Sequence, residues 1–178
     1  MAYRNHTVKI DFHTHIYPDK VAHKTVSAVC QRSGIEAYTD GTLEGLKGSM
    51  ATAGMDRGLP YPVHATPKRL AEVHRIIPEL CMIVAHLGGE DAYEETALHL
   101  LGKNIYMDTS FVMRKMPGAF LEHFLKEHPV ERLLFASDSP WTDQGEELRF
   151  LLQLPFLTES DKEKICFFNA ARLLGINQ

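Results

Sequence analysis

Two histidines separated by one residue, His13 and His15, end an apolar segment near the start of the chain. Val8, Ile10 and Phe12 alternate with polar residues there, which predicts a strand buried on one face. Residues two apart on a strand project from the same face, so both imidazoles can reach one cation. The spacing favours a metal site at the end of a strand, but a pair of surface histidines has the same spacing.

Two further apolar segments end in groups of the same kind. Residues 81–86 end in His86, and residues 132–138 end in Asp138. The carboxyl ends of parallel strands meet at one edge of a sheet, so these side chains can converge with the histidine pair. Each has a structural alternative, since His86 can cap the glycine turn after it and Asp138 can form an Asx turn.

Imidazole and carboxylate together suit zinc or a similar divalent ion that keeps one position open for water. Such an ion activates water and polarises a carbonyl. Asp138 can then take a proton, and His86 can orient the substrate or stabilise developing negative charge. We therefore expect one divalent ion held by His13, His15 and Asp138, with His86 and Asp138 as catalytic residues.

Other polar residues are weaker candidates. Asp108 ends a strand predicted over 104–109 and is equally plausible as a structural hydrogen-bond acceptor. His64 lies in a loop that can border the site, or simply leads into a helix. Trp141 can form a pocket wall or cover a loop. The remaining histidines of the predicted helices are expected at the surface: His74, His99, His123 and His128.

The composition is that of one α/β domain, covering residues 1–178. The net charge is −4 and the basic residues are scattered, which excludes nucleic acid as the main partner. A small-molecule substrate is expected instead. No apolar run approaches the length of a membrane span, and no signal-peptide pattern follows the first residues. The separated cysteines predict small buried thiols in a reducing cytoplasm: Cys30, Cys81 and Cys166.

Helical patterns alternate with the strands, which indicates a mostly parallel sheet. The prolines of residues 54–62 predict an extended loop that joins neither helix nor sheet. The last helix is expected to break near Asn169. The helices are predicted over residues 18–32, 42–53, 66–77, 91–101, 117–127, 144–153 and 158–174.

Five motifs carry a resemblance to a known family: 10–15 (IDFHTH), 84–89 (VAHLGG), 106–110 (YMDTS), 134–141 (LFASDSPW) and 168–175 (FNAARLLG). They resemble the amidohydrolase-related metal-dependent hydrolases of TIM-barrel fold. The most similar branch includes aminocarboxymuconate-semialdehyde and resorcylate decarboxylases. The resemblance implies that His13, His15 and Asp138 bind the metal and that His86 is catalytic or faces the substrate.

The chain is shorter than the family pattern. A complete barrel of this kind typically needs about 250 residues, and the four predicted strands correspond to the first, sixth, seventh and eighth. The second to fifth are missing, with an internal deletion near residues 50–58. Thr52 stands where the family carries another metal-binding histidine, so His64 or a partner chain is a possible substitute.

The expected fold is therefore a truncated TIM barrel, or half-barrel, with about four parallel strands in the order six, seven, eight, one and flanking helices. Its open edges favour a homodimer or larger homo-oligomer. The expected activity is hydrolysis of a small amide, ester or lactone by metal-activated water. A metal-dependent decarboxylase is the alternative within the family, and an inactive remnant or assembly module is the alternative of another class.

Overall fold

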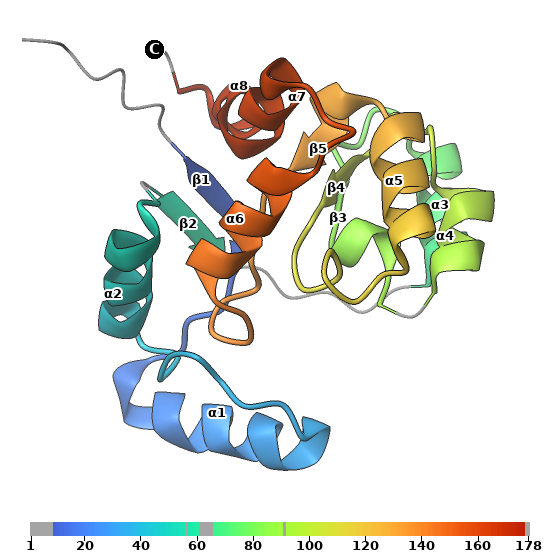
Figure 1. The fold of residues 1–178 in the computed structure, drawn as a ribbon. Helices are drawn as coiled ribbons and strands as arrows, with labels where there is room; N and C mark the ends of the chain where they lie inside the picture. Colours follow the sequence, from blue (N-terminus) through green and yellow to red (C-terminus); the bar gives the residue numbers. More distant parts are fainter. Residues whose placement is uncertain (1–8, 56, 61–65, 91, 177–178) are drawn as a thin grey trace, which may run out of the picture.

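The computed structural model describes residues 9–55, 57–60, 66–90 and 92–176 (Figure 1). Within them the strands are β1 (Ile10–Thr14), β2 (Arg57–Pro60), β3 (Ile83–Val84), β4 (Tyr106–Asp108) and β5 (Leu133–Leu134). The helices are α1 (Asp19–Ser33), α2 (Leu43–Ala53), α3 (Pro67–Ile76), α4 (Tyr93–His99), α5 (Gly118–Glu127), α6 (Gln144–Gln153), α7 (Glu159–Glu163) and α8 (Asn169–Leu174). Short 3₁₀ turns cover His86–Gly88 and Val130–Arg132, and a π-helical turn covers Lys164–Phe168.

The strands form two parallel sheets, β3-β4-β5 and β1-β2. The sheets meet where the chain leaving β5 pairs with the end of β1 through a parallel bridge between Thr14 and Ser139. The His15 N–H donates to the Ser139 carbonyl (2.6 Å), and the Asp138 N–H donates to the His13 carbonyl (2.8 Å). The truncated barrel is confirmed, and the order β3, β4, β5, β1 is the predicted order six, seven, eight, one. The strands nevertheless form two sheets joined by this one bridge, and a further strand, β2, lies beside β1.

The two sheets separate away from this junction. The Phe135 N–H donates to the Ile165 carbonyl of the π-helical turn (2.9 Å) and not to β1. In Figure 1, α7 and α8 lie above the ends of β1 and β5 that diverge. The junction at His13–His15 and Asp138–Ser139 therefore fixes how β1 and β5 lie relative to each other.

The prediction that residues 54–62 form a loop outside any sheet was wrong for residues 57–60, while residues 56, 61 and 62 lie outside the described residues. Residues 57–60 form β2, which pairs in parallel with β1, with Ile10 opposite Arg57 and Thr14 opposite Pro60. A proline is tolerated there because it ends the strand, and β2 has no second neighbour among the described residues. The chain therefore forms a strand beside β1 soon after α2, at the end of the segment where the deletion is predicted.

Local signals placed the helices well. The Thr42 side chain accepts from the Gly45 N–H and caps α2, and Thr158 forms a capping box with Asp161 at the start of α7. The predicted break near Asn169 is confirmed, because the π-helical turn ends one residue before it. The Asn169 side-chain amide donates to the carbonyls of Val130 (2.7 Å) and Leu133 (2.8 Å), which ties α8 to β5.

Two of the surface and burial predictions were wrong. His128 is buried, and its Nε2 lies 3.0 Å from the Ile105 carbonyl, so this histidine belongs to the core. Burial lowers the pKa of His128 and favours the neutral ring. Cys166 is buried as expected and Cys30 is partly buried, but Cys81 is exposed; all three cysteines are free thiols.

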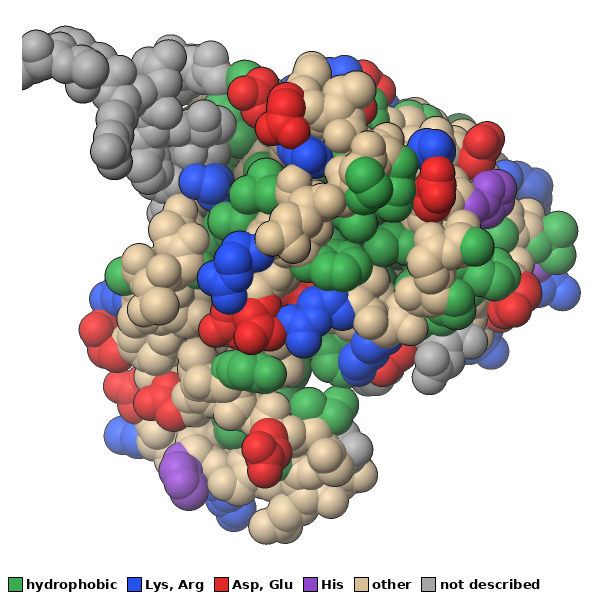
Figure 2. Space-filling model, in the orientation of Figure 1, with side chains coloured by type: hydrophobic (Ala, Val, Ile, Leu, Met, Phe, Trp, Pro, Cys, Tyr) green, Lys and Arg blue, Asp and Glu red, His purple; other side chains and the backbone are tan. Residues whose placement is uncertain are grey.

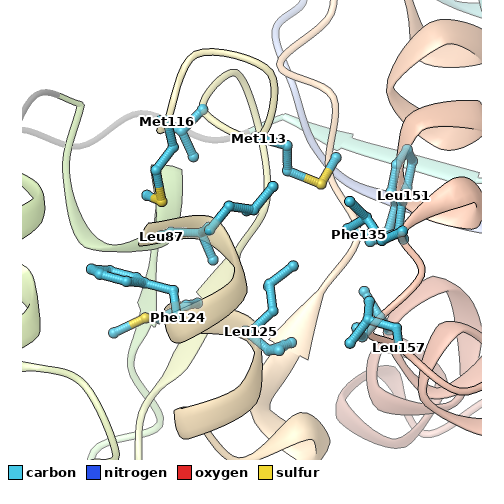
Figure 3. Close-up of a cluster of buried hydrophobic side chains, with 14 of the residues drawn as sticks. Leu87, Met113, Met116, Phe124, Leu125, Phe135, Leu151 and Leu157 are labelled. Carbon is cyan, nitrogen blue, oxygen red and sulfur yellow. The ribbon is translucent and has the colours of Figure 1, made fainter. Parts of the chain in front are cut away.

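The main core packs α5 and α6 against the three-stranded sheet (Figure 3). Phe124, Phe135 and Leu151 are fully enclosed there. Neighbouring residues of β5 enter different clusters: Leu133 joins this core, whereas Leu134 joins a smaller one with Ile10 and the residues of α8. In the described part of the chain, none of the helices combines the length and apolar character needed to cross a membrane.

Candidate metal centre

Three side chains converge at the junction of the two sheets. His13 is the next-to-last residue of β1, His15 is the first residue after β1, and Asp138 lies in the segment after β5. The Nε2 atoms of His13 and His15 lie 3.2 Å apart, and Asp138 Oδ1 lies 3.2 Å and 2.8 Å from them, respectively. His13 and Asp138 are buried, whereas His15 is partly exposed. The two imidazoles and the carboxylate that the sequence predicted as ligands therefore face one common point.

The backbone turns sharply where three strands lead into this region. His86, Phe111 and Asp138 have φ values of 58°, 64° and 67°, in the left-handed region that residues other than glycine adopt at a cost. Asp138 is held there because its N–H donates to His13 and its carbonyl accepts from Trp141 (2.9 Å). The fold thus maintains a strained backbone at the positions that direct side chains towards the centre.

Asp108 sets the orientation of the His13 ring. Its Oδ2 lies 3.0 Å from His13 Nδ1, and both side chains are almost fully buried. An ionised carboxylate only accepts, so Nδ1 carries a proton, and in the neutral ring the lone pair of Nε2 faces His15 and Asp138. A carboxylate behind a ligating imidazole is the usual support of a metal-binding histidine.

The charges of this pair stabilise each other. Burial alone would raise the pKa of Asp108, but the hydrogen bond and charge of His13 outweigh it, and the pKa is lowered. Burial works to lower the pKa of His13, whereas the hydrogen bond and charge of Asp108 raise it, and the net shift is upward. Asp108 therefore stays ionised and continues to accept from His13.

Asp108 also positions His86. The His86 N–H donates to Asp108 Oδ1 (3.0 Å), and His86 Nδ1 lies 3.1 Å from the Ser110 carbonyl oxygen and 2.9 Å from Ser110 Oγ. A carbonyl only accepts, so His86 Nδ1 carries the proton and Nε2 stays available for chemistry. The His86 and His13 rings stack with centroids 5.0 Å apart. Asp108 and Ser110 thus serve both histidines.

These donors fit a divalent ion. Asp138 Oδ1 is buried and takes part in no hydrogen bond among the described residues, although two imidazole nitrogens lie close to it. Imidazole nitrogen and carboxylate oxygen are typical ligands of zinc and related ions. His13, His86 and Asp108 also lie close together, but hydrogen bonds of Asp108 and Ser110 occupy their facing atoms. We therefore interpret His86 and Asp108 as residues that support the group formed by His13, His15 and Asp138.

Asp11 supports the junction from behind. Its carboxylate accepts from the Ser137 N–H (2.8 Å), the Gln144 side chain (2.8 Å) and the His13 N–H (3.2 Å), and also pairs with the Ser137 hydroxyl. Burial raises the pKa of Asp11 to about 6, although these hydrogen bonds work to lower it. Asp11 therefore ties β1 to the loop that carries Asp138.

Three further residues were named in the sequence analysis: Thr52, His64 and Trp141. Thr52, which stands where the family carries another metal-binding histidine, is exposed on α2, where its hydroxyl donates to the Gly48 carbonyl (3.0 Å). His64 lies outside the described residues. Trp141 lines a cleft beside the centre together with Phe111, whose ring lies 6.0 Å from that of His86. The sequence analysis did not identify Asp11 as the support of the Asp138 loop or Ser110 as a partner of His86. The position of Ser110, two residues after Asp108, is the sequence signal that could have indicated its role.

The sequence model of the amidohydrolase family matches residues 55–176, which include His86, Asp108 and Asp138. A search of curated proteins gave no match. Among solved structures, an uncharacterized TIM-barrel protein from Bordetella bronchiseptica shares 16% identity over 94% of this chain and 98% of that one, with a TM-score of 0.68. Amidohydrolase 2 from Bifidobacterium longum subsp. infantis shares 15% identity over 96% of this chain and 100% of that one, with a TM-score of 0.55.

A third structure is a decarboxylase. The 2,6-dihydroxybenzoate decarboxylase from Rhizobium shares 18% identity over 60% of this chain, with a TM-score of 0.47, and this chain covers 38% of its length. At these identities the likeness to solved structures concerns the fold, which is that of TIM-barrel proteins represented here by only part of the barrel.

Proposed function

The chain belongs to the amidohydrolase family, and from this premise we propose that it is a metal-dependent hydrolase of a small amide, ester or lactone. One observation supports the proposal above others. Two imidazole nitrogens and one carboxylate oxygen lie within 3.2 Å of each other at the junction of the sheets. The stacked His86 ring adds an acid–base group beside them.

We propose zinc as the ion, held by His13, His15 and Asp138. When bound, such an ion acts as a Lewis acid that activates water and polarises a substrate carbonyl. The chain prepares the site before binding, because Asp108 fixes the His13 tautomer and the bridge between Thr14 and Ser139 fixes the distance between the two strands. Preformed ligands reduce the ordering cost of binding.

The chain's own groups then move the protons. Asp138 supplies a carboxylate that takes a proton as water attacks. His86 presents Nε2 to the substrate because Ser110 holds its Nδ1 proton, and a protonated His86 can donate to a developing negative charge. His86 is partly exposed, as a group that must meet a substrate needs to be.

We also propose that the chain works as a homo-oligomer. Within the described residues, β2 and β3 each have one strand neighbour, so the half-barrel has two open edges. Open edges favour pairing with a second chain. Light scattering of the purified protein tests this: a mass near 40 kDa or above, about twice the 20.1 kDa chain, is expected, and a monomer at every concentration contradicts it.

The hydrolase proposal is tested by elemental analysis of the purified protein and by turnover of chromogenic esters, anilides and lactones with and without a chelator. We expect about one equivalent of metal per chain and turnover that stops on chelation and returns with zinc. Release of carbon dioxide from aryl carboxylates without hydrolysis would replace the hydrolase by a decarboxylase. A protein that retains no metal at pH 7 would favour an inactive or assembly role.

A further inference from the structure

A cleft of about 550 Å³ lies next to the metal centre, between the loop after α1, the loop after β4 and the start of α6. We call it the aromatic cleft; its lining includes Tyr38, Phe111, Arg114, Lys115, Trp141 and Glu147. It adjoins the centre because Phe111 contacts His86 and the Trp141 N–H donates to the Asp138 carbonyl. None of the metal ligands lines it.

The wall of the aromatic cleft contains a buried carboxylate, Glu147, with one oxygen that has no hydrogen-bond partner among the described residues. Glu147 is 2% exposed, and its Oε2 makes no hydrogen bond among the described residues. The nearest cation, Arg114, lies 3.7 Å from Oε1, beyond hydrogen-bond distance, and pairs more closely with Glu146. A buried acceptor without a donor is costly, so a ligand in the cleft that donates to this carboxylate would remove that cost.

The two cations of the aromatic cleft are already engaged. Lys115 Nζ lies 3.0 Å from the centroid of the Phe111 ring and 3.3 Å from Glu90 Oε1. Arg114 is paired with Glu146. Figure 2 shows acidic and basic side chains next to one another across the middle of the drawn face, beside hydrophobic ones. The group in the aromatic cleft that can still accept a hydrogen bond is the Glu147 carboxylate, and a positively charged donor suits it best.

Three aromatic side chains complete the recognition surface: Tyr38, Phe111 and Trp141. Aromatic faces attract organic cations and also provide apolar area for a ring. An anion would find both cations already paired and a buried carboxylate facing it. The chemistry favours a ligand that combines an ammonium group with an apolar ring.

We propose that the aromatic cleft binds a small arylalkylammonium group, with the nitrogen donating to Glu147 and the ring lying against Trp141. This site goes beyond the proposed hydrolase activity and does not require the metal. Where that activity holds, the site selects substrates that carry a protonated amine. The aromatic cleft recognises the positive charge, the N–H donors and the aromatic ring of this ligand together.

Trp141 provides the readout, because it is the only tryptophan of the sequence. Phenethylammonium chloride is titrated into chelator-treated protein at pH 8 while the tryptophan emission is recorded. Two probes of similar size serve as comparisons: 2-phenylethanol, which is neutral, and 3-phenylpropionate, which is negatively charged. We expect saturable change with phenethylammonium in the millimolar range or below, and affinity at least about tenfold weaker for the other two.

Glu147→Gln should weaken binding of phenethylammonium about tenfold or more, since the amide lacks the charge. Glu122→Gln, on the exposed side of α5, is the matched control and should change nothing. A circular-dichroism melt shows that each variant is folded. If Glu147→Gln fails to fold, saturation-transfer NMR of the three probes with the unaltered protein still ranks them.

Equal or tighter binding of 3-phenylpropionate overturns the proposal, as does a folded Glu147→Gln variant with unchanged affinity. Absence of binding by all three probes also overturns it. Because the titration uses chelator-treated protein, these outcomes concern only the aromatic cleft. The proposed hydrolase activity is tested separately, by metal content and turnover.

Discussion

Asp108 Oδ2 lies 3.0 Å from His13 Nδ1, although the two residues are 95 positions apart in the chain. The same carboxylate accepts the His86 N–H through Oδ1 (3.0 Å). One side chain of β4 therefore fixes a proposed ligand from β1 and the proposed acid–base group after β3. This relationship leads to the first prediction.

Asp108→Asn should lower the affinity for zinc about 10–100-fold, because the amide no longer holds the Nδ1 proton of His13 by charge. Competition with a fluorescent chelator measures the affinity. Asp19→Asn, on the exposed first turn of α1, is the control and should have the affinity of the unaltered protein. An unchanged affinity in Asp108→Asn would show that His13 needs no carboxylate support.

Removal of a proposed ligand should remove the metal. His13→Ala and Asp138→Ala should each reduce the zinc content to a small fraction of one equivalent, because the remaining two donors hold the ion weakly. His123→Ala changes an exposed histidine of α5 and should retain the full content. Elemental analysis of the three proteins, purified in parallel, decides; full occupancy in both of the first variants would falsify the ligand assignment.

His86→Ala should separate binding from chemistry. The ring touches His13 by stacking but lies outside the proposed ligand set, so the metal should stay. Loss of a positioned acid–base group typically lowers the rate about 10²–10⁴-fold. Metal content and ester turnover are measured on the same preparation. Loss of both together would make His86 a structural or ligating residue.

Gly88→Ala should destabilise the turn that carries His86. Gly88 has φ = 98°, and an added Cβ would lie 2.3 Å from Thr96 Cγ2. We expect a cost of about 2 kcal/mol or more, seen as a fall in Tm of about 5 °C or more. Gly118→Ala places a methyl group in open space at the start of α5 and should leave Tm unchanged or raise it. An equal Tm for the Gly88→Ala and Gly118→Ala variants would contradict the predicted strain at Gly88.

The stability of the protein should fall as the pH rises from about 5 to 8, in part because of Glu147. Burial raises the pKa of Glu147 to about 7 from 4.5, opposed by the charge of Arg114 and assisted by Glu146, Asp11 and Asp143. Between these values the folded state binds more protons than the unfolded state, so raising the pH favours unfolding.

Glu147→Gln should therefore gain stability at pH 8 relative to the unaltered protein, by about 1–3 kcal/mol, with little difference at pH 5. Urea unfolding at the two pH values, in the presence of chelator, measures the difference. A larger gain at pH 5 than at pH 8 would mean that the carboxylate is stabilised by its surroundings, opposite to the expected effect of burial.

Some features of this chain follow from neighbours in the sequence. Thr42 and Thr158 cap helices through residues three positions away, and the alternation around His13 marks a strand. Five short motifs, one of them around Asp138, resemble those of a known family, and this resemblance implied the fold and the order of the strands. These signals act within a few residues, so they can be recognised without knowing the rest of the fold.

Other features depend on strands far apart in the chain. Residues 57–60 contain a proline and appear as a loop, yet pairing with β1 makes them a strand. His128 looks like a surface histidine, and becomes a core residue because Ile105 offers a carbonyl. In each case the partner lies outside the local window, so tertiary contacts override the local preference.

The sequence by itself determined which residues could bind a metal and on which strand ends they lie. The tertiary structure decided that Asp108 and Ser110 hold two of the histidines, and that Glu147 lies buried on the wall of a cleft beside them. The reason is physical: periodicity reports which face a residue occupies, whereas hydrogen bonding and burial depend on what the folded chain places opposite that face.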